Sequence, residues 1–376
     1  MIVGINLIAQ SNERSTGAFR YVQLMLQAMG EYELDNCKFI VYHQETVSQE
    51  YLSIPKSLNV EYVQVPAVGS GLKRILFEQT KFYSYLKPCD VLYSYCTSLP
   101  LFVKAKKIFT LHDIYYLTMK DRYSWLQTQY LKLITSVYLR MCDKVLTVSE
   151  YSYSEILKYT CCKKEKLDIT YNFLLPKNEN YIPSSGRITS LDGEEIDITK
   201  PYFLYVGNLQ PGKNVVGMVE GFEQFCNRKD DYQLLIVGQP RFNGEDIKNK
   251  ISSIKNVKVL GYQSRENVEF LFSNCLAVVL LSFCEGFGIP PLEGFGYGKP
   301  ALTSNLMSLP EVVGKAGCLV NPYHINEIAE GFKQIIENNQ EYIKHIPIQL
   351  EKFDFHNSVE KFMDTIGICY KRICNS

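Results

Sequence analysis

The stretch Phe283-Cys284-Glu285-Gly286-Phe287-Gly288-Ile289-Pro290-Pro291-Leu292-Glu293 decides the fold of the second half of the chain. It follows the apolar run Leu276–Leu281 and leads into a segment with helical spacing, so we interpret it as a strand-to-helix turn. Gly286 and Gly288 let backbone amides approach a ligand closely, and Pro291 suits the first turn of a helix. Such a helix start offers unpaired N–H groups to an anion, for example a phosphate.

Two carboxylates eight positions apart bracket this turn. Glu293, close to the expected helix start, is suited to accept both hydroxyls of a ribose, and Glu285 those of a second sugar. Each charge-assisted hydrogen bond would contribute roughly 1.5–3 kcal/mol. Taken alone, the pair also fits a plainer interpretation, in which Glu285 supports a helix cap and Glu293 is a solvated helix residue.

Apolar runs rich in β-branched residues alternate with helical patterns along most of the chain, which predicts an α/β fold with mostly parallel sheets. The strands expected in the first half are Ile2–Leu7, Lys38–Tyr42, Val60–Val65, Val91–Tyr95, Lys107–Leu111 and Lys144–Val148. Those expected in the second half are Tyr202–Val206, Gln233–Val237, Val257–Leu260, Leu276–Leu281, Ala301–Ser304 and Cys318–Val320. The helix after the turn is expected over Pro291–Tyr297.

A polar segment from Pro176 to Pro201 interrupts the alternation and predicts two domains. We expect residues 1–175 to form the first domain, 176–200 a linker or surface excursion, and 201–353 the second domain. The aromatic-rich tail, about 354–376, is expected to form a helix that packs on the first domain. Ligands of parallel sheets bind beyond the carboxyl ends of the strands, so a cleft between the domains is the expected site.

Composition excludes several classes of protein. Forty basic residues balance forty acidic ones, which argues against a general nucleic-acid binder. Twelve cysteines are scattered without a C-x-x-C pair, which indicates free thiols rather than a zinc ribbon or a redox motif. The apolar runs are too short to span a bilayer, and the N-terminus has the pattern of a first strand. We therefore expect a cytoplasmic protein, either free or associated with the cytoplasmic face of a membrane.

The turn resembles the E-x7-E motif of the retaining glycosyltransferases of family four, which have the GT-B fold of two Rossmann-like domains. Residues 297–305 and 308–314 resemble the strand and loop that follow the motif in that family, and 205–214 resembles the glycine loop that opens its second domain. The segment Thr110-Leu111-His112-Asp113-Ile114 resembles a His-Asp motif of the mannosyltransferase-like members.

The resemblance implies roles for the second-domain residues. Lys213 would stabilise the negative charge of the departing diphosphate, and the loop at Gly207 and Asn208 would approach the donor. The sequence departs from the family here, because neither Asn208 nor Gly212 is the Arg that usually accompanies this Lys. Glu285 would orient the transferred sugar and Glu293 the ribose. The resemblance also implies donor contacts from the backbone around Gly286, Phe287, Gly288 and Ile289. It implies that the segment Gly261-Tyr262 receives the base, although Tyr262 is equally well explained as an aromatic residue of a loop.

In the first domain the resemblance implies that His112 hydrogen-bonds the donor sugar and does not act as a base. Gly17 and Ala18 occupy the first-domain glycine loop, where Ala18 replaces the usual second Gly, and Arg20 is a candidate compensating cation. Asp113 is expected to cap the following segment. The serines of Val148-Ser149-Glu150-Tyr151-Ser152 fit helix caps as well as ligand contacts.

The reaction implied is transfer of a hexose, with retention, from a GDP-mannose-like or UDP-sugar to a glycan or lipid-linked acceptor. No D-x-D triplet is present, so we expect neither a metal nor another cofactor. Cell-surface polysaccharide synthesis (capsule or lipopolysaccharide) is the expected context. A group of basic and apolar residues in the first half would suit an anionic bilayer, or is ordinary solvated charge beside core residues. It consists of lysines 73, 104, 106 and 107, Arg74, Leu72, Leu76, Leu99, Leu101 and Phe102.

Three other functions fit parts of the sequence. A sugar-nucleotide epimerase of GT-B architecture would bind the same donor, but its own motifs are not seen. A non-catalytic nucleotide-sugar-binding protein is favoured by the missing Arg at Asn208 and Gly212. An NAD-dependent dehydrogenase is disfavoured because no G-x-G-x-x-G follows the first expected strand.

Overall fold

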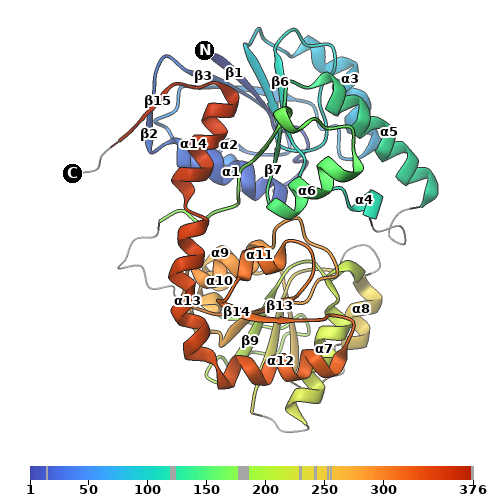
Figure 1. Cartoon of the computed structure of the whole chain (residues 1–376), viewed down its shortest axis with the longest axis vertical. Coiled ribbons are helices and arrows are strands. Elements are labelled where there is room, and N and C mark those ends of the chain that lie inside the picture. The colour runs from blue at the N-terminus through green and yellow to red at the C-terminus, as the bar shows by residue number, and fades with distance from the viewer. Residues whose placement is uncertain are drawn as a thin grey trace. The chain divides into compact units, whose positions relative to one another are not determined.

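The computed structural model describes residues 1–13, 16–118, 124–176, 186–227, 231–240, 244–251, 254 and 256–373 (Figure 1). The chain divides into two units. The first consists of Met1–Leu175 and Asp354–Ser376, and the second of Pro176–Phe353.

The first unit is built on a seven-stranded parallel sheet with the order β4-β3-β1-β5-β6-β7-β8. Its strands are β1 (Ile2–Asn6), β3 (Lys38–Gln44), β4 (Val60–Val65), β5 (Val91–Ser94), β6 (Lys106–Thr110), β7 (Lys144–Thr147) and β8 (Leu167–Ile169). Six of them follow the expected runs to within two residues. The short edge strand β8 was not predicted, because three residues carry too little periodicity.

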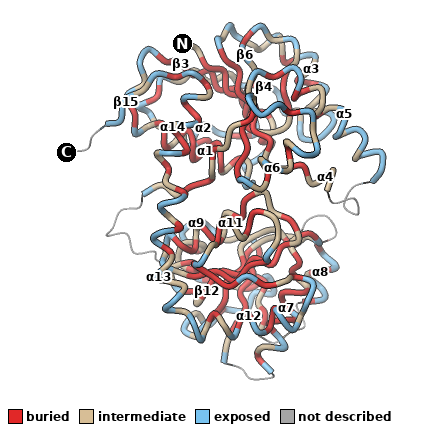
Figure 2. The backbone as a smooth tube through the Cα atoms, viewed as in Figure 1, coloured by how far each residue is buried: buried red, intermediate tan, exposed pale blue. Residues whose placement is uncertain are grey.

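Helices connect the strands of the first unit. They are α1 (Gly17–Met29), α2 (Gln49–Leu52), α3 (Leu72–Gln79), α4 (Tyr115–Thr118), α5 (Trp125–Met141) and α6 (Glu150–Tyr159). Figure 2 shows the strands of this sheet largely buried and α5 largely exposed. Helix α5 begins with a capping box in which Ser124 and Gln127 exchange side-chain-to-backbone hydrogen bonds.

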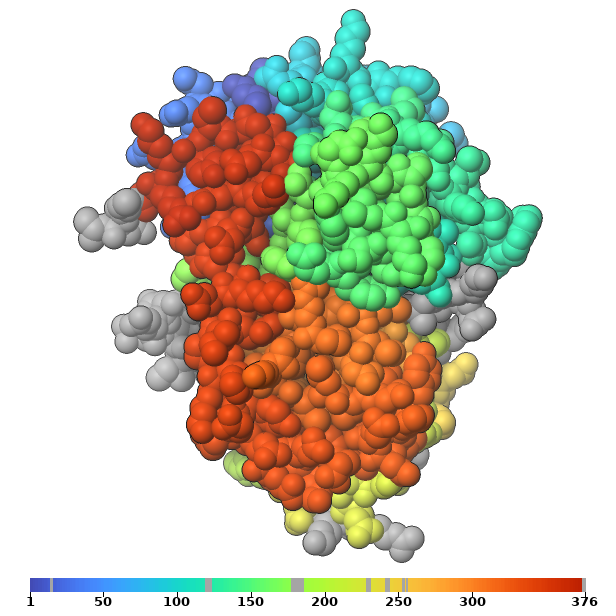
Figure 3. Space-filling view, viewed as in Figure 1, coloured from blue at the N-terminus to red at the C-terminus, as the bar shows by residue number. Residues whose placement is uncertain are grey.

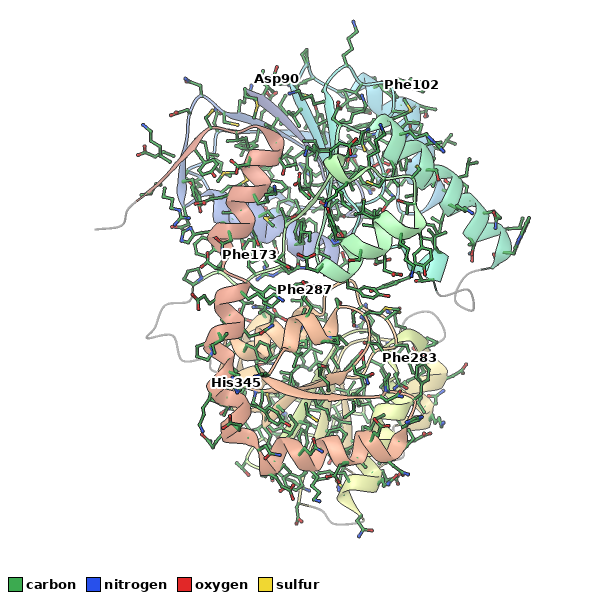
Figure 4. All side chains as sticks on the ribbon, in the orientation of Figure 1. Asp90, Phe102, Phe173, Phe283, Phe287 and His345 are labelled. Carbon is green, nitrogen blue, oxygen red and sulfur yellow. The ribbon has the colours of Figure 1, made fainter. Side chains whose placement is uncertain are left out.

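The C-terminal tail belongs to the first unit, as expected. Helix α14 (Phe355–Ile366) places Phe362 edge-on against Tyr93 of β5, and its Phe355 contacts Phe173 with ring centroids 6.2 Å apart (Figure 4). After it, β15 (Tyr370–Arg372) pairs antiparallel with β2 (Tyr32–Leu34), a two-stranded sheet that the sequence did not predict. Figure 3 shows this red segment on the surface of the first unit.

The second unit contains a six-stranded parallel sheet with the order β11-β10-β9-β12-β13-β14. Its strands are β9 (Tyr202–Val206), β10 (Gln233–Val237), β11 (Val257–Gly261), β12 (Ala277–Leu280), β13 (Ala301–Ser304) and β14 (Gly317–Val320). Its helices are α7 (Val215–Cys226), α8 (Gly244–Ile251), α9 (Arg265–Asn274), α10 (Ile289–Phe295), α11 (Leu309–Val313), α12 (Ile325–Glu337) and α13 (Asn339–Lys352).

Residues 186–200, part of the expected linker, pack on the second unit. Ile188 and Ile196 are buried in the cluster that includes Leu204 and Leu260, and the Leu191 amide donates to the Val259 carbonyl at 2.9 Å. Because the segment has few apolar residues, its sequence did not predict that these two isoleucines would be buried. Residues 177–185 of the expected linker lie outside the described residues.

The described cysteines are all free thiols, and most of them are buried. Within the same residues, no helix is both long enough and apolar enough to cross a membrane.

Candidate donor-binding site

The candidate site lies at the point where the second sheet reverses its strand order. Strand β9 pairs with β10 on one side and with β12 on the other, so the connections that follow β9 and β12 run toward opposite edges of the sheet. Loops that follow two such strands diverge and leave a crevice at their carboxyl ends, where α/β sheets bind ligands. The loop after β9 carries Gly207, Asn208 and Lys213, and the loop after β12 carries Glu285.

The two loops contact each other through an ion pair. Lys213 Nζ lies 2.5 Å from Glu285 Oε1, and the same oxygen accepts a hydrogen bond from Ser282 Oγ at 2.8 Å. The backbones also meet, because the Phe283 amide donates to the Gly212 carbonyl at 3.0 Å. Both charged side chains are mostly buried. Two residues 72 positions apart thus present a cation and a carboxylate at one place.

Buried serines from the next strand and loop hold the motif in position. Ser308 Oγ donates to the carbonyls of Glu285 and Phe287 at 2.7 and 3.0 Å, and Ser304 Oγ donates to the Ser282 carbonyl at 2.7 Å. Both serines are fully buried. Both serines lie in segments that resemble the family, but their role was not predicted, because the acceptor of a serine hydroxyl is identified only in three dimensions.

Gly288 is required by the backbone at the start of α10. Its φ of +102° is one that residues with a side chain rarely adopt, and a Cβ there would lie 2.5 Å from Leu309 Cδ2. The helix begins at Ile289, two residues before the predicted Pro291, with prolines in the first turn where no N–H partner is needed. The Phe287 ring is buried edge-on against Phe353, so Phe287 has only backbone groups to offer a ligand.

Glu293, on α10, forms an ion pair that the sequence did not predict. Its Oε1 accepts from Arg265 Nη1 at 3.0 Å, while Arg265 Nε donates to Glu269 at 2.7 Å. Arg265 begins α9, directly after the Gly261-Tyr262 segment. A basic group therefore does lie beside the motif, although it contacts Glu293 and not the loop that carries Lys213.

The other expected donor contacts have defined positions. Gly261 has a φ of +68° and accepts a hydrogen bond from the Gly238 amide, whereas the Tyr262 ring is 69% exposed. The Asn208 carbonyl accepts from Tyr205 Oη at 3.0 Å. Burial raises the pKa of Tyr205, and the charge of Glu285 raises it further, so this phenol remains a neutral donor.

In the first unit, His112 follows β6 at the carboxyl end of the sheet. Its Nε2 lies 2.9 Å from the Tyr95 carbonyl, which can only accept, so Nε2 carries the hydrogen. Burial lowers the pKa of His112 to about 4, and the ring is neutral at physiological pH. Nδ1 is then an acceptor, suited to a hydroxyl and unsuited to holding a proton as a strong base.

The remaining first-unit candidates have structural partners. Gly17 and Ala18 form the first turn of α1, which Thr16 caps by accepting from the Phe19 amide. Arg20 donates to Gln23 at 2.9 Å. Ser15, the first residue of the matched loop, lies outside the described residues.

Asp113 caps the following segment, as expected, and Ser149, for which capping and ligand contact were equally open, caps a helix. Asp113 Oδ1 accepts from the Tyr115 amide, and Ser149 caps α6 by accepting from the Ser152 amide. Ser152 Oγ in turn donates to the His112 carbonyl at 3.0 Å, which links the cap to the backbone of the candidate histidine.

Two of the ten residues expected on the basic and apolar surface are not available, although Leu72, Leu76 and Phe102 are exposed. Leu99 is fully buried, and Arg74 forms two 3.0 Å hydrogen bonds with the buried Glu78 carboxylate. The Ser98 hydroxyl and the Asn6 side-chain amide also donate hydrogen bonds to this carboxylate. Arg74 therefore balances an internal charge, a pairing that sequence spacing alone does not distinguish from a surface pair.

Residues 174–347 match the model of the family described as "Glycosyl transferases group 1". Over these residues the chain is similar to that family. The matched range contains both loops of the candidate site and both glutamates of the motif.

The curated relatives of the chain include mannosyltransferases. It is 26% identical to O-antigen chain mannosyltransferase B of Escherichia coli over 62% of each chain. It is also 26% identical to O-antigen chain mannosyltransferase RfbU of Salmonella typhimurium, over 66% of this chain and 65% of that one. The match thus spans less than two thirds of the length of either relative.

Solved structures share the fold over nearly the whole chain. Anabaena Alr3699/HepE in complex with UDP and glucose has a TM-score of 0.71 at 17% identity, covering 98% of this chain and 99% of that one. WaaG, a glycosyltransferase involved in lipopolysaccharide biosynthesis, has a TM-score of 0.70 at 14% identity, covering 97% and 99%. These likenesses concern the fold alone, and they identify it as GT-B with two Rossmann-like domains.

No group of three or more His, Cys, Asp or Glu side chains with the geometry of a metal site occurs within the described part of the chain.

Proposed function

We propose that the protein is a retaining glycosyltransferase that transfers a hexose from a nucleotide diphosphate sugar without a metal ion. The observation that carries this proposal is the meeting of Lys213 and Glu285 at the switch point of the second sheet. In the unliganded chain the two charges satisfy each other. A bound donor would separate their tasks, with Lys213 turned to the diphosphate and Glu285 to the sugar hydroxyls.

The chemistry of glycosyl transfer calls for this pair of charges. Positive charge grows on the sugar and negative charge on the departing diphosphate as the bond breaks. A fixed ammonium stabilises the leaving group in the transition state, and a mostly buried position strengthens that interaction. We propose that Glu293 holds the ribose, that the backbone at Gly207, Asn208, Gly261 and Gly288 contacts the donor, and that Arg265 supplies the second cation of the site.

We propose that His112 contacts the transferred sugar as a neutral hydrogen-bond acceptor. The family resemblance and its position at the carboxyl end of β6 support this role. Its low pKa supports hydroxyl binding over proton abstraction. A GDP-mannose-like donor and a role in O-antigen or similar polysaccharide synthesis are proposed from the mannosyltransferases among its relatives.

The acceptor is proposed to be a glycan or a lipid-linked glycan reached at an anionic membrane surface. Trp125, Leu126 and Leu133 of α5 are each at least two-thirds exposed, and Lys132 lies exposed among them. Phe102 is exposed on the same unit (Figure 4). Apolar side chains that flank lysines suit insertion into the headgroup region of anionic lipids.

A panel of UDP-, GDP- and ADP-sugars tests the function. Slow hydrolysis of one donor that persists in excess EDTA, with the α-anomer released first from an α-linked donor, is the expected result. Interconversion of the sugar would identify an epimerase, and tight binding without turnover a non-catalytic nucleotide-sugar-binding protein. Either outcome would overturn the proposal.

Vesicle binding tests the membrane contact separately. The Leu126→Gln/Leu133→Gln variant should lose co-sedimentation with phosphatidylglycerol vesicles. The exposed Tyr159→Gln variant on α6 serves as a matched control that retains it. Equal sedimentation of both variants would exclude α5 as the contact.

A further inference from the structure

A polar pocket of about 410 Å³ opens on the first unit, apart from the residues assigned above. Its lining includes His43, Glu45, Gln49, Glu50, Tyr62 and Gln64. The family resemblance assigns no role to any of these side chains.

The pocket is formed by two adjacent strands and a short helix. In the parallel pairing of β3 and β4, Val41 is the partner of Tyr62 and His43 the partner of Gln64. Side chains alternate between the faces of a sheet, so His43, Tyr62 and Gln64 project from one face. The His43 and Tyr62 rings meet edge-on at 6.0 Å. Glu50, on α2, adds a carboxylate to this face.

His43 supplies the observation that points to a ligand. The residue is 4% exposed, and its Nδ1 lies 3.1 and 3.0 Å from the carbonyls of Gln44 and Val47. These carbonyls only accept, so Nδ1 carries the hydrogen and Nε2 of the neutral ring is an acceptor. Nε2 is buried and has no hydrogen-bond partner within the described residues. A buried acceptor left unpaired costs about 1–3 kcal/mol, which a ligand hydroxyl would offset once a small shift of the lining side chains opens Nε2 to the pocket.

The other lining groups define the class of that ligand. Glu45 and Glu50 accept hydrogen bonds and repel anions, which excludes phosphate. Gln49 and Gln64 both donate and accept, and Tyr62 offers a flat apolar ring. Such a set of groups matches a neutral polyhydroxylated ring. We propose that this pocket binds a sugar residue of the acceptor glycan.

The position of the pocket indicates which part of an acceptor it binds. Strands β1 and β5 separate β3 from β6, which leads to His112, so the two places lie roughly 14 Å apart along the carboxyl edge of the sheet. Because the acceptor is taken from the proposed function, the pocket would hold a sugar several units away from the reacting end. The protein would then favour oligomeric acceptors over short ones.

The loop after β1 is tied to the rim of the pocket. Glu13 Oε1 accepts from the Ser48 amide and hydroxyl at 2.9 and 2.6 Å, and Thr46 Oγ1 donates to the Ser11 carbonyl at 2.9 Å. These hydrogen bonds hold the pocket rim and the segment preceding α1 as one structure.

Saturation-transfer-difference NMR on the full chain tests the inference without a donor. The probes are α-linked mannotetraose, maltotetraose and β-linked galactotetraose, with GDP and UDP measured in parallel. We expect the saturation-transfer signal of a tetraose to fall about tenfold in His43→Phe and Gln64→Ala, each of which removes one polar contact. The signal should fall less in Glu50→Gln, which removes the charge but keeps one acceptor oxygen. Gln129→Ala, an exposed change on α5, is the matched control and should retain the full signal.

Two results would overturn the inference. One is a tetraose signal that is unchanged in Gln64→Ala and Glu50→Gln, which lie at exposed positions and should fold even if His43→Phe does not. The other is binding of a nucleotide with no binding of any tetraose, which would leave the proposed donor site intact. Failure of nucleotides and tetraoses alike would overturn the proposed function as well.

Discussion

In the second unit, two charged residues marked by the sequence lie in adjacent loops and pair with each other, whereas in the first unit Ala18, Asp113 and the His112 side chain each have a different local partner. Lys213 and Glu285 form one ion pair at the switch point of the sheet. In contrast, Ala18 lies in a helix turn, Asp113 serves as a cap, and His112 donates to a strand-end carbonyl. A site whose residues contact one another within short motifs is therefore easier to recognise from sequence than a site whose residues have separate local partners.

The strongest test of this comparison is removal of either charge of the pair. Lys213→Ala or Glu285→Ala should lower donor turnover about 100-fold, equivalent to about 2.7 kcal/mol, because the first removes the cation that stabilises the departing diphosphate and the second removes the carboxylate that orients the sugar. The double variant should lose much less than the product of the two effects, since the residues act together. Kinetics of donor hydrolysis provide the measurement.

A surface ion pair of the same unit is the matched control. Lys250→Ala removes a partner of Glu220, which lies 3.0 Å away with both side chains about half exposed, and should leave turnover within about twofold. If Lys250→Ala and Lys213→Ala had equal effects, the switch-point pair would be a structural feature only.

The pH dependence of stability tests the assignment of His112 in the first unit. The pKa of His112 is about 4 when folded, below its ordinary 6.5, so between these values the unfolded chain binds more protons. Stability contributed by the neutral ring is therefore present above pH 6.5 and is lost as the pH falls toward 4. Relative to His112→Phe, the wild type should lose about 2–3 kcal/mol of unfolding free energy over this interval. Urea denaturation at several pH values measures it, and identical pH slopes would contradict the assignment.

A smaller effect is expected when the support of the motif is weakened. Ser308→Ala removes two hydrogen bonds to loop carbonyls and should reduce the free energy of unfolding by about 1–2 kcal/mol. Because these carbonyls belong to Glu285 and Phe287, the KM for donor should rise too. Thermal and urea denaturation are compared with Ser84→Ala, an exposed serine whose loss should be nearly neutral. A stable variant with an unchanged KM would show that the loop holds its shape without Ser308.

The smallest effect concerns Arg265. Arg265→Ala should raise the KM for donor about threefold with little change in kcat, since a half-exposed ion pair contributes less than about 1 kcal/mol. Arg265→Lys should recover part of the loss. A fall in kcat at constant KM would instead place Arg265 in the transition-state chemistry.

Local pattern predicted much of the fold because it carries the information directly. The apolar and aromatic runs of β9 and β10 predicted both pairs of strand boundaries without error, and the glycines and prolines after β12 marked a turn into a helix. The start of α10 was placed two residues late, because Gly288 acts as the cap through its positive φ and spacing shows only a glycine. The short strands β2, β8 and β15 are formed by pairing across the fold and have no pattern of their own.

The sequence by itself determined the α/β class, the order of most strands along the chain and the family motif, because hydrophobic period and turn chemistry are local properties. Only the tertiary structure decided that Glu285 pairs with Lys213, Glu293 with Arg265, and Arg74 with the buried Glu78. It also decided that His43 has an unpaired nitrogen at a polar pocket. Partners of charged and polar groups depend on which strands become neighbours in a sheet, and strand order follows from packing of the whole unit.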